Sequence, residues 1–165
     1  MRGTLLITAA LFAGTSAFGA DQATVRVEPA KLQGPRQLQE QTGKAVIQDY
    51  LQSWETLKAA LEQNRPDLLD RDFVGSAKEK LANTIQEQNA LGVHTNYADR
   101  SHHLQILFYS PEGLSIQLAD NVEYDVQIFD HDKAAATQKV RARYIVILTP
   151  SEVRWRVRVF QAVAD

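Results

Sequence analysis

The sequence contains no cysteine among its 165 residues. Disulfides, thiolate metal sites and a cysteine nucleophile are therefore excluded. Basic residues are not in excess, because 18 lysines and arginines stand against 20 aspartates and glutamates. This balance disfavours binding to a nucleic-acid backbone, which depends on positive charge. After the first twenty residues, no apolar run reaches the roughly 18 residues of a membrane-spanning helix.

The first twenty residues have the three-part pattern of a secretory signal peptide. Met1 and Arg2 form a short basic start, residues 3–12 are mostly apolar, and residues 13–20 are rich in small side chains. We expect cleavage between residues 17 and 20, and a periplasmic or secreted location. Removal of the leader leaves about 145 residues. Because the leader holds one of the 18 basic residues, the mature chain has 17 basic against 20 acidic residues and a net charge of −3. An uncleaved N-terminal anchor is the alternative.

The next part of the chain changes from an irregular to a helical pattern. Residues 21–37 include Pro29, Gly34 and Pro35 without sustained periodicity, which indicates an extended tether. From residue 38 to about residue 64, apolar side chains recur at helical spacing, from Val46 to Leu61. Pro66 is suited to the first position of a new helical segment. That segment, residues 68–91, is divided at residues 75–76 into a short and a long helix.

After Gly92 the apolar period changes to two, which is typical of strands. Residues 104–108 form one strand, and residues 110–113 form a hairpin turn. Residues 114–128 form one long strand, or two collinear strands with a bulge at Asp120 and Asn121. Two further strands cover residues 140–148 and 153–159. This order predicts an α+β domain over residues 38–165, with N-terminal helices packed on a curved antiparallel sheet of about four strands.

Several short motifs resemble those of a known family. They are Trp54 to Ala60 in the first helix, Gly92, Tyr97 and Leu104 to Ile106 toward the sheet, and finally Ala142 to Tyr144 and Trp155 to Val157. Over residues 38–163 the chain resembles the nuclear-transport-factor-2-like superfamily, which includes SnoaL-like cyclases and ketosteroid isomerases. Within it, the chain looks most similar to the intermembrane-space domain of plastid-division proteins and their bacterial relatives. The resemblance implies a cone-like fold and a non-enzymatic interaction domain, without identifying a partner.

The four histidines do not form a metal-binding pattern. His102 and His103 are adjacent on a predicted strand, so their side chains point to opposite faces and cannot share one metal. Asp130, His131 and Asp132 could bind a divalent ion weakly, but a solvated loop explains them better. We therefore expect no metal site and no cofactor.

Isomerase-like chemistry would need a carboxylate base and an oxyanion donor inside the cone. Strand parity places Glu123 and Asp125 on the outer face, so we expect no inward carboxylate on the strands and no useful aspartate–histidine pair. Asp49 and Glu55 on the first helix could reach the cone mouth. The inward aromatic residues are interpreted as core packing, with a pocket for a small apolar ligand as the alternative: Tyr50, Trp54, Tyr124, Tyr144 and Trp155.

Arginines gather on the last two predicted strands. A turn at residues 149–152 would pair Val146 with Trp155 and place Arg143 opposite Arg158, and this like-charge pair needs nearby anions. Pairing Tyr124 with Tyr144 would supply Asp125. The outer face would also carry Ile145, Ile147 and Phe160, and apolar side chains among arginines suit an interface. The predicted interaction surface comprises Arg141, Arg143, Arg154, Arg156, Arg158 and Phe160.

These observations predict an exported, non-enzymatic binding domain that uses its sheet face or its cone pocket. Its partner would be another protein, an anionic envelope polymer or a second copy of the chain. A small-molecule-binding protein or a cyclase- or isomerase-like enzyme is the alternative. The net charge and the export signal argue against nucleic acid as a partner.

Overall fold

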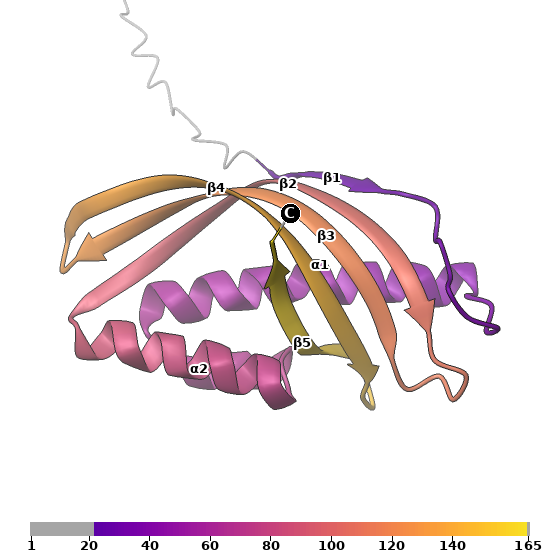
Figure 1. Ribbon diagram of the computed structural model, residues 1–165. Helices are drawn as coiled ribbons and strands as arrows, with labels where there is room; N and C mark the ends of the chain where they lie inside the picture. Colours follow the sequence, from indigo (N-terminus) through magenta and orange to yellow (C-terminus); the bar gives the residue numbers. More distant parts are fainter. Residues whose placement is uncertain (1–21, 165) are drawn as a thin grey trace, which may run out of the picture.

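A computed structural model describes residues 22–164, so the predicted leader of residues 1–20 lies outside the described part of the chain. Helices α1 (Glu40–Gln63) and α2 (Gly75–Ala90), with the short 3-10 helix η1 (Pro66–Arg71) between them, lie beneath an arched sheet (Figure 1). The strands of this sheet are β1 (Thr24–Val27), β2 (Val93–Tyr109), β3 (Ile116–Asp130), β4 (Lys133–Pro150) and β5 (Trp155–Val163). Within residues 22–164, no helix is long and apolar enough to cross a membrane.

The helices follow the predicted pattern closely. The buried side chains of α1 recur every three or four residues and form one face: Val46, Tyr50, Trp54, Leu57 and Leu61. Asn64 ends the helix in a left-handed conformation (φ 51°), and its backbone N–H donates to the carbonyl of Ala60. Gly75 and Gly92 also have positive φ angles (53° and 70°), which explains why glycine stands at the start and just beyond the end of α2.

The α+β cone is confirmed, with five strands rather than about four. The strands follow sequence order across the sheet, and β1 pairs in parallel with β2 whereas all other pairs are antiparallel. β1 lies within the segment predicted to be a tether. That segment is extended, but it docks along the sheet: the N–H groups of Glu28, Lys31 and Gln33 donate to carbonyls of β2.

The predicted irregularity at Asp120 and Asn121 is wrong. Pairing of β3 with both neighbours continues unbroken through these residues, with Asp120 opposite Leu104 on β2 and Tyr144 on β4. The β2–β3 register shifts instead between Asp99 and Ser101, and again between residues 106 and 108 on β2. Because β3 stays regular here, Asp120 keeps the inward parity of its apolar neighbours and is fully buried.

The predicted register of the last hairpin is also wrong. The turn covers residues 151–154 and is closed by hydrogen bonds from the backbone N–H and Oγ of Ser151 to the Arg154 carbonyl. Pro150 therefore faces Trp155. Farther along, the register shifts so that Arg158 is the extra residue of a bulge, and Phe160 faces Val146.

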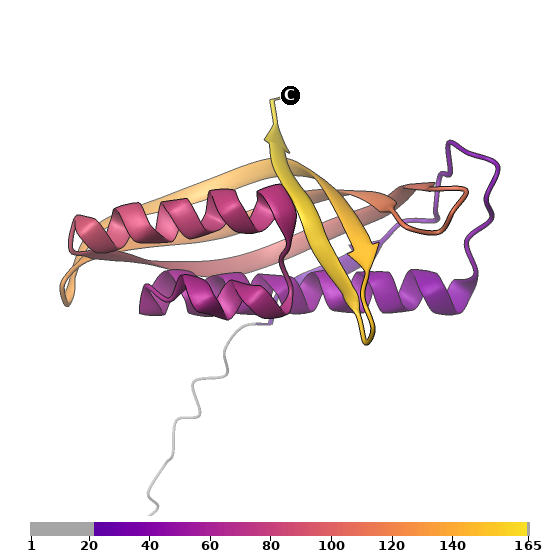
Figure 2. The same cartoon turned by 90° about the horizontal axis from the view of Figure 1, so that it is seen from below.

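This shift changes the neighbours and the faces of the last strands. Arg143 faces Val163 rather than Arg158, and Asp125 faces Lys139 rather than Arg143. A one-residue slip also turns every following side chain to the other face. Phe160 accordingly stacks on Tyr144 inside the cone, with a centroid distance of 4.3 Å, so its predicted position on the outer face is wrong. Figure 2 shows β5 crossing toward the side of the sheet that holds α2.

Candidate functional site

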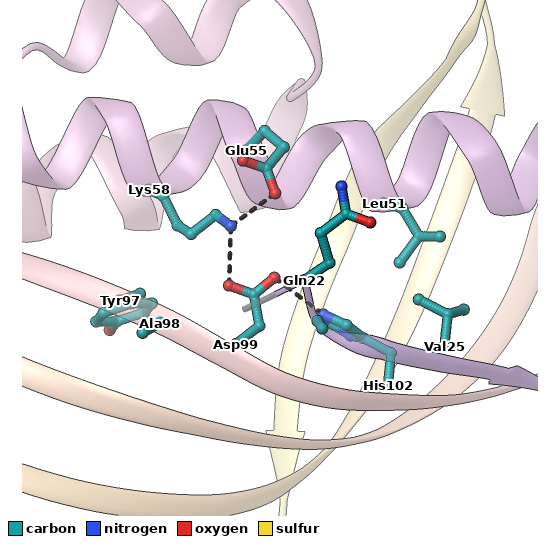
Figure 3. A pocket seen from close by; sticks show the side chains of 10 residues that line it. Gln22, Val25, Leu51, Glu55, Lys58, Tyr97, Ala98, Asp99 and His102 are labelled. Atoms are coloured by element: carbon teal, nitrogen blue, oxygen red, sulfur yellow. Dashed lines mark hydrogen bonds and ion pairs between the residues drawn. The ribbon is translucent and has the colours of Figure 1, made fainter. Parts of the chain in front are cut away.

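A cavity of about 560 Å³ opens between α1 and the edge of the sheet formed by β1 and β2. We call it the polar hollow, because charged side chains from both layers point into it (Figure 3). Its lining comes from the chain before β1, from β1 itself, from α1 and from β2: Gln22, Ala23, Val25, Leu51, Glu55, Lys58, Tyr97, Ala98, Asp99 and His102.

A continuous chain of polar contacts runs from this hollow into the core. Lys58 Nζ lies 2.6 Å from a Glu55 oxygen and 2.9 Å from Asp99 Oδ1. The other Asp99 oxygen lies 3.3 Å from Nε2 of His102, and Nδ1 of His102 lies 2.7 Å from Asp120 Oδ2. His102 is therefore held between two carboxylates, one at the hollow and one in the core.

The inner end of this chain reaches two aromatic side chains of α1. The hydroxyl of Tyr50 donates to Asp120 Oδ2 over 2.8 Å, and Nε1 of Trp54 donates to the Tyr50 hydroxyl over 2.9 Å. Tyr50 and Trp54 lie one helical turn apart, so they present their polar atoms to the same place. Asp120 Oδ1 is buried and has no hydrogen-bond partner among residues 22–164.

The protonation states follow from burial and from these neighbours. Burial of His102 disfavours its cation, but hydrogen bonds to Asp120 and Asp99, with their charges, outweigh burial and raise its pKa to about 9. Burial also disfavours the anion of Asp99, but the bonds to His102 and Lys58 lower its pKa to about 2. Burial and the nearby charge of Asp120 raise the pKa of Tyr50 well above its usual value. At neutral pH, His102 is thus a cation between carboxylates.

Local backbone geometry brings Asp99 and His102 to one side of β2. In a regular strand, residues three apart point to opposite faces. The register shift between Asp99 and Ser101 makes Arg100 the extra residue of a bulge, and the alternation is reversed there. Both side chains therefore face α1, while Arg100 pairs with Asp125.

The sequence interpretation did not identify this cluster. The expectation of no inward carboxylate on the strands, and of no aspartate–histidine pair, is wrong, because Asp120 and Asp99 both contact His102. Two signals were available in the strand alternation. His102 lies two residues from the buried Leu104, and Asp120 lies two residues from the buried Leu118, so each shares the inward face of its strand. No signal marked Asp99, because its orientation depends on the bulge.

The five inward aromatic residues, interpreted as core packing with a pocket as the alternative, do not all lie together. Tyr50, Trp54, Tyr124 and Tyr144 meet inside the cone, where the Trp54 ring lies 5.7 Å from that of Tyr124 and the hydroxyls of Tyr124 and Tyr144 are 3.0 Å apart. Trp155 lies apart from them and packs against Tyr109. None of the five lines the polar hollow, whose single aromatic ring besides His102 is Tyr97.

The six residues of the predicted interaction surface are likewise separated. Arg154 lies 3.3 Å from the buried carboxylate of Asp72, and Arg156 donates to the carbonyl of Asp70. The Arg158 carbonyl accepts from Ser76, and Phe160 is inside the cone. Arg141 and Arg143 remain on the outer face, where they line a hollow of about 220 Å³ and Arg141 pairs with Glu123.

Comparisons with known proteins support the fold. No family model and no curated protein matches the chain. Among solved structures, it is similar to the intermembrane space region of the chloroplast protein ARC6, with a TM-score of 0.63 and 13% identity, over 79% of this chain and all of that one. A provisionally named scytalone dehydratase from Novosphingobium aromaticivorans matches with a TM-score of 0.51 and 10% identity, over 76% and 89% of the two chains.

A protein from Kribbella flavida, Kfla4162, matches with a TM-score of 0.52 and 8% identity, over 74% of this chain and 92% of that one. Identities this low speak for the fold alone. The arched sheet, the long first helix and the order of elements agree with this likeness. The chain therefore shares a cone-shaped α+β fold with these solved structures.

Proposed function

We propose that this protein is a binding domain whose ligand lies between α1 and the β1–β2 edge of the sheet. Beside the polar hollow lies a second cavity of about 550 Å³, here called the apolar hollow, lined mainly by aliphatic side chains, among them Val27, Leu38, Ile47 and Ile106. Leu51 lines both hollows, so they adjoin along α1. We call the two hollows together the groove. A concave, largely apolar site with a few placed polar groups is typical of ligand binding.

The engagement of both ring nitrogens of His102 by carboxylates is the observation that carries this proposal. A general base must be unprotonated at the working pH. His102 is instead held as a cation by Asp99 and Asp120, and Lys58 lies within ion-pair distance of Glu55 and Asp99. These groups form a fixed wall that can orient a ligand, which supports binding rather than catalysis.

Binding of the neutral fluorophore Nile red tests this proposal. We expect saturable binding with blue-shifted emission, because the apolar hollow excludes water from the dye. Ile47→Trp fills this hollow and should weaken binding by about tenfold, which corresponds to roughly 1.4 kcal/mol. Val153→Trp is the matched control, since Val153 is 82% exposed in the β4–β5 turn. Equal binding by the wild type and the Ile47 variant would contradict a site in the groove.

An acid–base enzyme of the cyclase or isomerase kind is the second candidate. Asp99 and His102 favour it, because they line an open hollow beside the hydroxyl-bearing Tyr97. An NMR titration of the His102 ring separates the two candidates. A midpoint near pH 9 supports the fixed cation of a binding site, whereas a midpoint near pH 7 would leave a base available and favour the enzyme.

A periplasmic or secreted location belongs to the same proposal. It is supported by the leader-like first twenty residues and by the likeness to an intermembrane space region of a chloroplast protein. Fractionation of cells that express the full chain tests it: the expected product is shorter by 17–20 residues and is found in the periplasmic fraction or in the medium. An unshortened product retained with the cytoplasm would contradict the location.

A further inference from the structure

β1 leaves one of its two edges without a strand partner. It is an edge strand of the sheet, and among residues 22–164 only β2 pairs with it. The N–H of Glu28 donates to the carbonyl of Leu104 on β2. Because the backbone groups of a strand alternate between its two edges, those of Arg26 also face β2, whereas those of Val25 and Val27 face the free edge. Two N–H and two carbonyl groups are thus available there.

The side chains of the same two valines face the groove. Val25 lines the polar hollow and Val27 lines the apolar hollow. Their side chains are 42% and 53% exposed, which is high for valines on the face of the sheet that is turned toward α1. β1 therefore combines a free backbone edge with two apolar positions at a spacing of two residues. An isolated apolar ligand would cover the valines and leave the backbone groups unused.

The rim of the groove carries carboxylates at both ends. Glu55 and Asp99 lie at the polar hollow, and Glu28 and Glu40 lie at the apolar hollow. These four carboxylates pair with four cations: Arg26, Lys44, Lys58 and His102. The rim is therefore neutral overall, and Glu40 and Glu55 are its most exposed carboxylates, at 82% and 60%. Basic groups at the ends of a ligand would face these two exposed carboxylates.

We propose that the groove takes an extended peptide of a partner protein, which adds to the free edge of β1 as a further strand. Its backbone pairs with the free groups of Val25 and Val27, and alternate apolar side chains enter the groove. A basic residue near each end faces the rim carboxylates. This mode, in which main-chain bonds supply affinity and side-chain pockets supply selectivity, is common where a sheet edge is open. The inference rests on the proposed binding function and specifies its ligand class.

A defined peptide tests strand addition with the full-length chain. The probe is a fluorescein-labelled, amidated heptapeptide with lysine at each end and two valines alternating with three threonines between them, so that lysines and valines share one face of the strand. Fluorescence polarisation should show saturable binding. A second peptide, N-methylated at every other backbone amide so that it cannot donate to β1, should bind at least about tenfold more weakly. Equal affinity of the two peptides would overturn strand addition.

Two variants of Val27 separate the backbone from the side chain. Val27→Pro removes an N–H that faces the free edge but not a bond to β2, so we expect about a tenfold loss of peptide affinity. Val27→Ala keeps the N–H and trims the side chain, and should lose only about threefold. An equal effect of the two variants overturns the backbone role. The methylated peptide decides the question if the proline variant fails to fold.

Three further outcomes distinguish this inference from the function on which it rests. If Nile red binds to the groove but the heptapeptide does not, strand addition is overturned while the binding function stands. If neither probe binds, both are overturned. If light scattering shows a dimer that Val27→Pro converts to a monomer, the edge is occupied by a second copy of the chain, and the partner peptide is overturned.

Discussion

The His102 cluster should make the stability of this protein depend on pH. Two carboxylates contact the ring, Asp99 of β2 and Asp120 of β3, and they in turn contact Lys58 and Tyr50 of α1, respectively. Folding raises the pKa of His102 from 6.5 to about 9. Each pKa unit corresponds to about 1.4 kcal/mol of preference for the protonated form, so the full shift corresponds to roughly 3 kcal/mol.

The sign follows from linkage between protonation and folding. Because the pKa of His102 is raised in the folded state, its contribution is fully present below the unfolded value near pH 6.5. It is lost progressively as the pH rises through about 9. We therefore expect the free energy of unfolding to fall by about 2–3 kcal/mol between pH 6.5 and 9.5.

Urea unfolding, followed by tryptophan fluorescence, measures this dependence directly. Trp54 is a suitable reporter, since its ring lies 5.1 Å from that of His102. The perturbation is His102→Gln, which leaves Asp99 and Asp120 without their shared cation. At pH 6.5 this variant should be less stable by about 3–5 kcal/mol, as expected when one partner of a buried ion pair is removed. Its stability should no longer fall between pH 6.5 and 9.5.

The matched control is His103→Gln, one residue along β2. His103 faces the outer side of the sheet, where it lines the small hollow with Arg141 and Arg143. It should retain the wild-type pH dependence and lose less than about 1 kcal/mol. If His102→Gln keeps the wild-type slope, or if the wild type is equally stable at both pH values, the charged triad is refuted.

Three other predictions concern single side chains. Phe160→Ala should lower the free energy of unfolding by about 2–4 kcal/mol in urea, because the ring stacks on Tyr144 inside the cone. A loss below about 0.5 kcal/mol would indicate that the ring lies on the surface. Arg154→Ala should cost about 1–3 kcal/mol, because the buried Asp72 loses a charged partner, and a thermal shift assay would measure this loss. The pKa of Asp99 is lowered to about 2, so its ionised form contributes stability that is present above about pH 4 and is lost as the pH falls through 2. In acid unfolding, Asp99→Asn should lack this loss of stability. An acid-unfolding profile identical to that of the wild type would contradict this prediction.

Much of the fold was predictable because its determinants are local. The spacing of apolar residues from Val46 to Leu61 determines the buried face of α1, and Asn64 and Pro66 determine where it ends. The change of period after Gly92 indicates strands, although the first predicted strand, residues 104–108, covers only the end of β2, and residues 110–113 form the predicted hairpin turn. Each of these signals lies within a few residues of the feature it predicts.

The site was not predictable from the same signals, because it depends on pairing between distant segments. The bulge at Arg100 aligns Asp99 with His102, and it exists only where β2 meets β3. The bulge at Arg158 likewise turns Phe160 inward, although the sequence around it alternates regularly. One extra residue in a strand reverses the faces of all that follow, and the sequence of one strand does not show which partner residues will oppose it.

The sequence alone thus determined the α+β class, the helix boundaries and the absence of thiol chemistry. Tertiary structure decided which charged side chains meet. Asp99, His102 and Asp120 come from two strands and form one buried triad under α1, and β1 docks on β2 and borders the groove. The physical reason is that secondary structure follows local periodicity, whereas strand register follows the summed free energy of pairing and burial over the whole sheet.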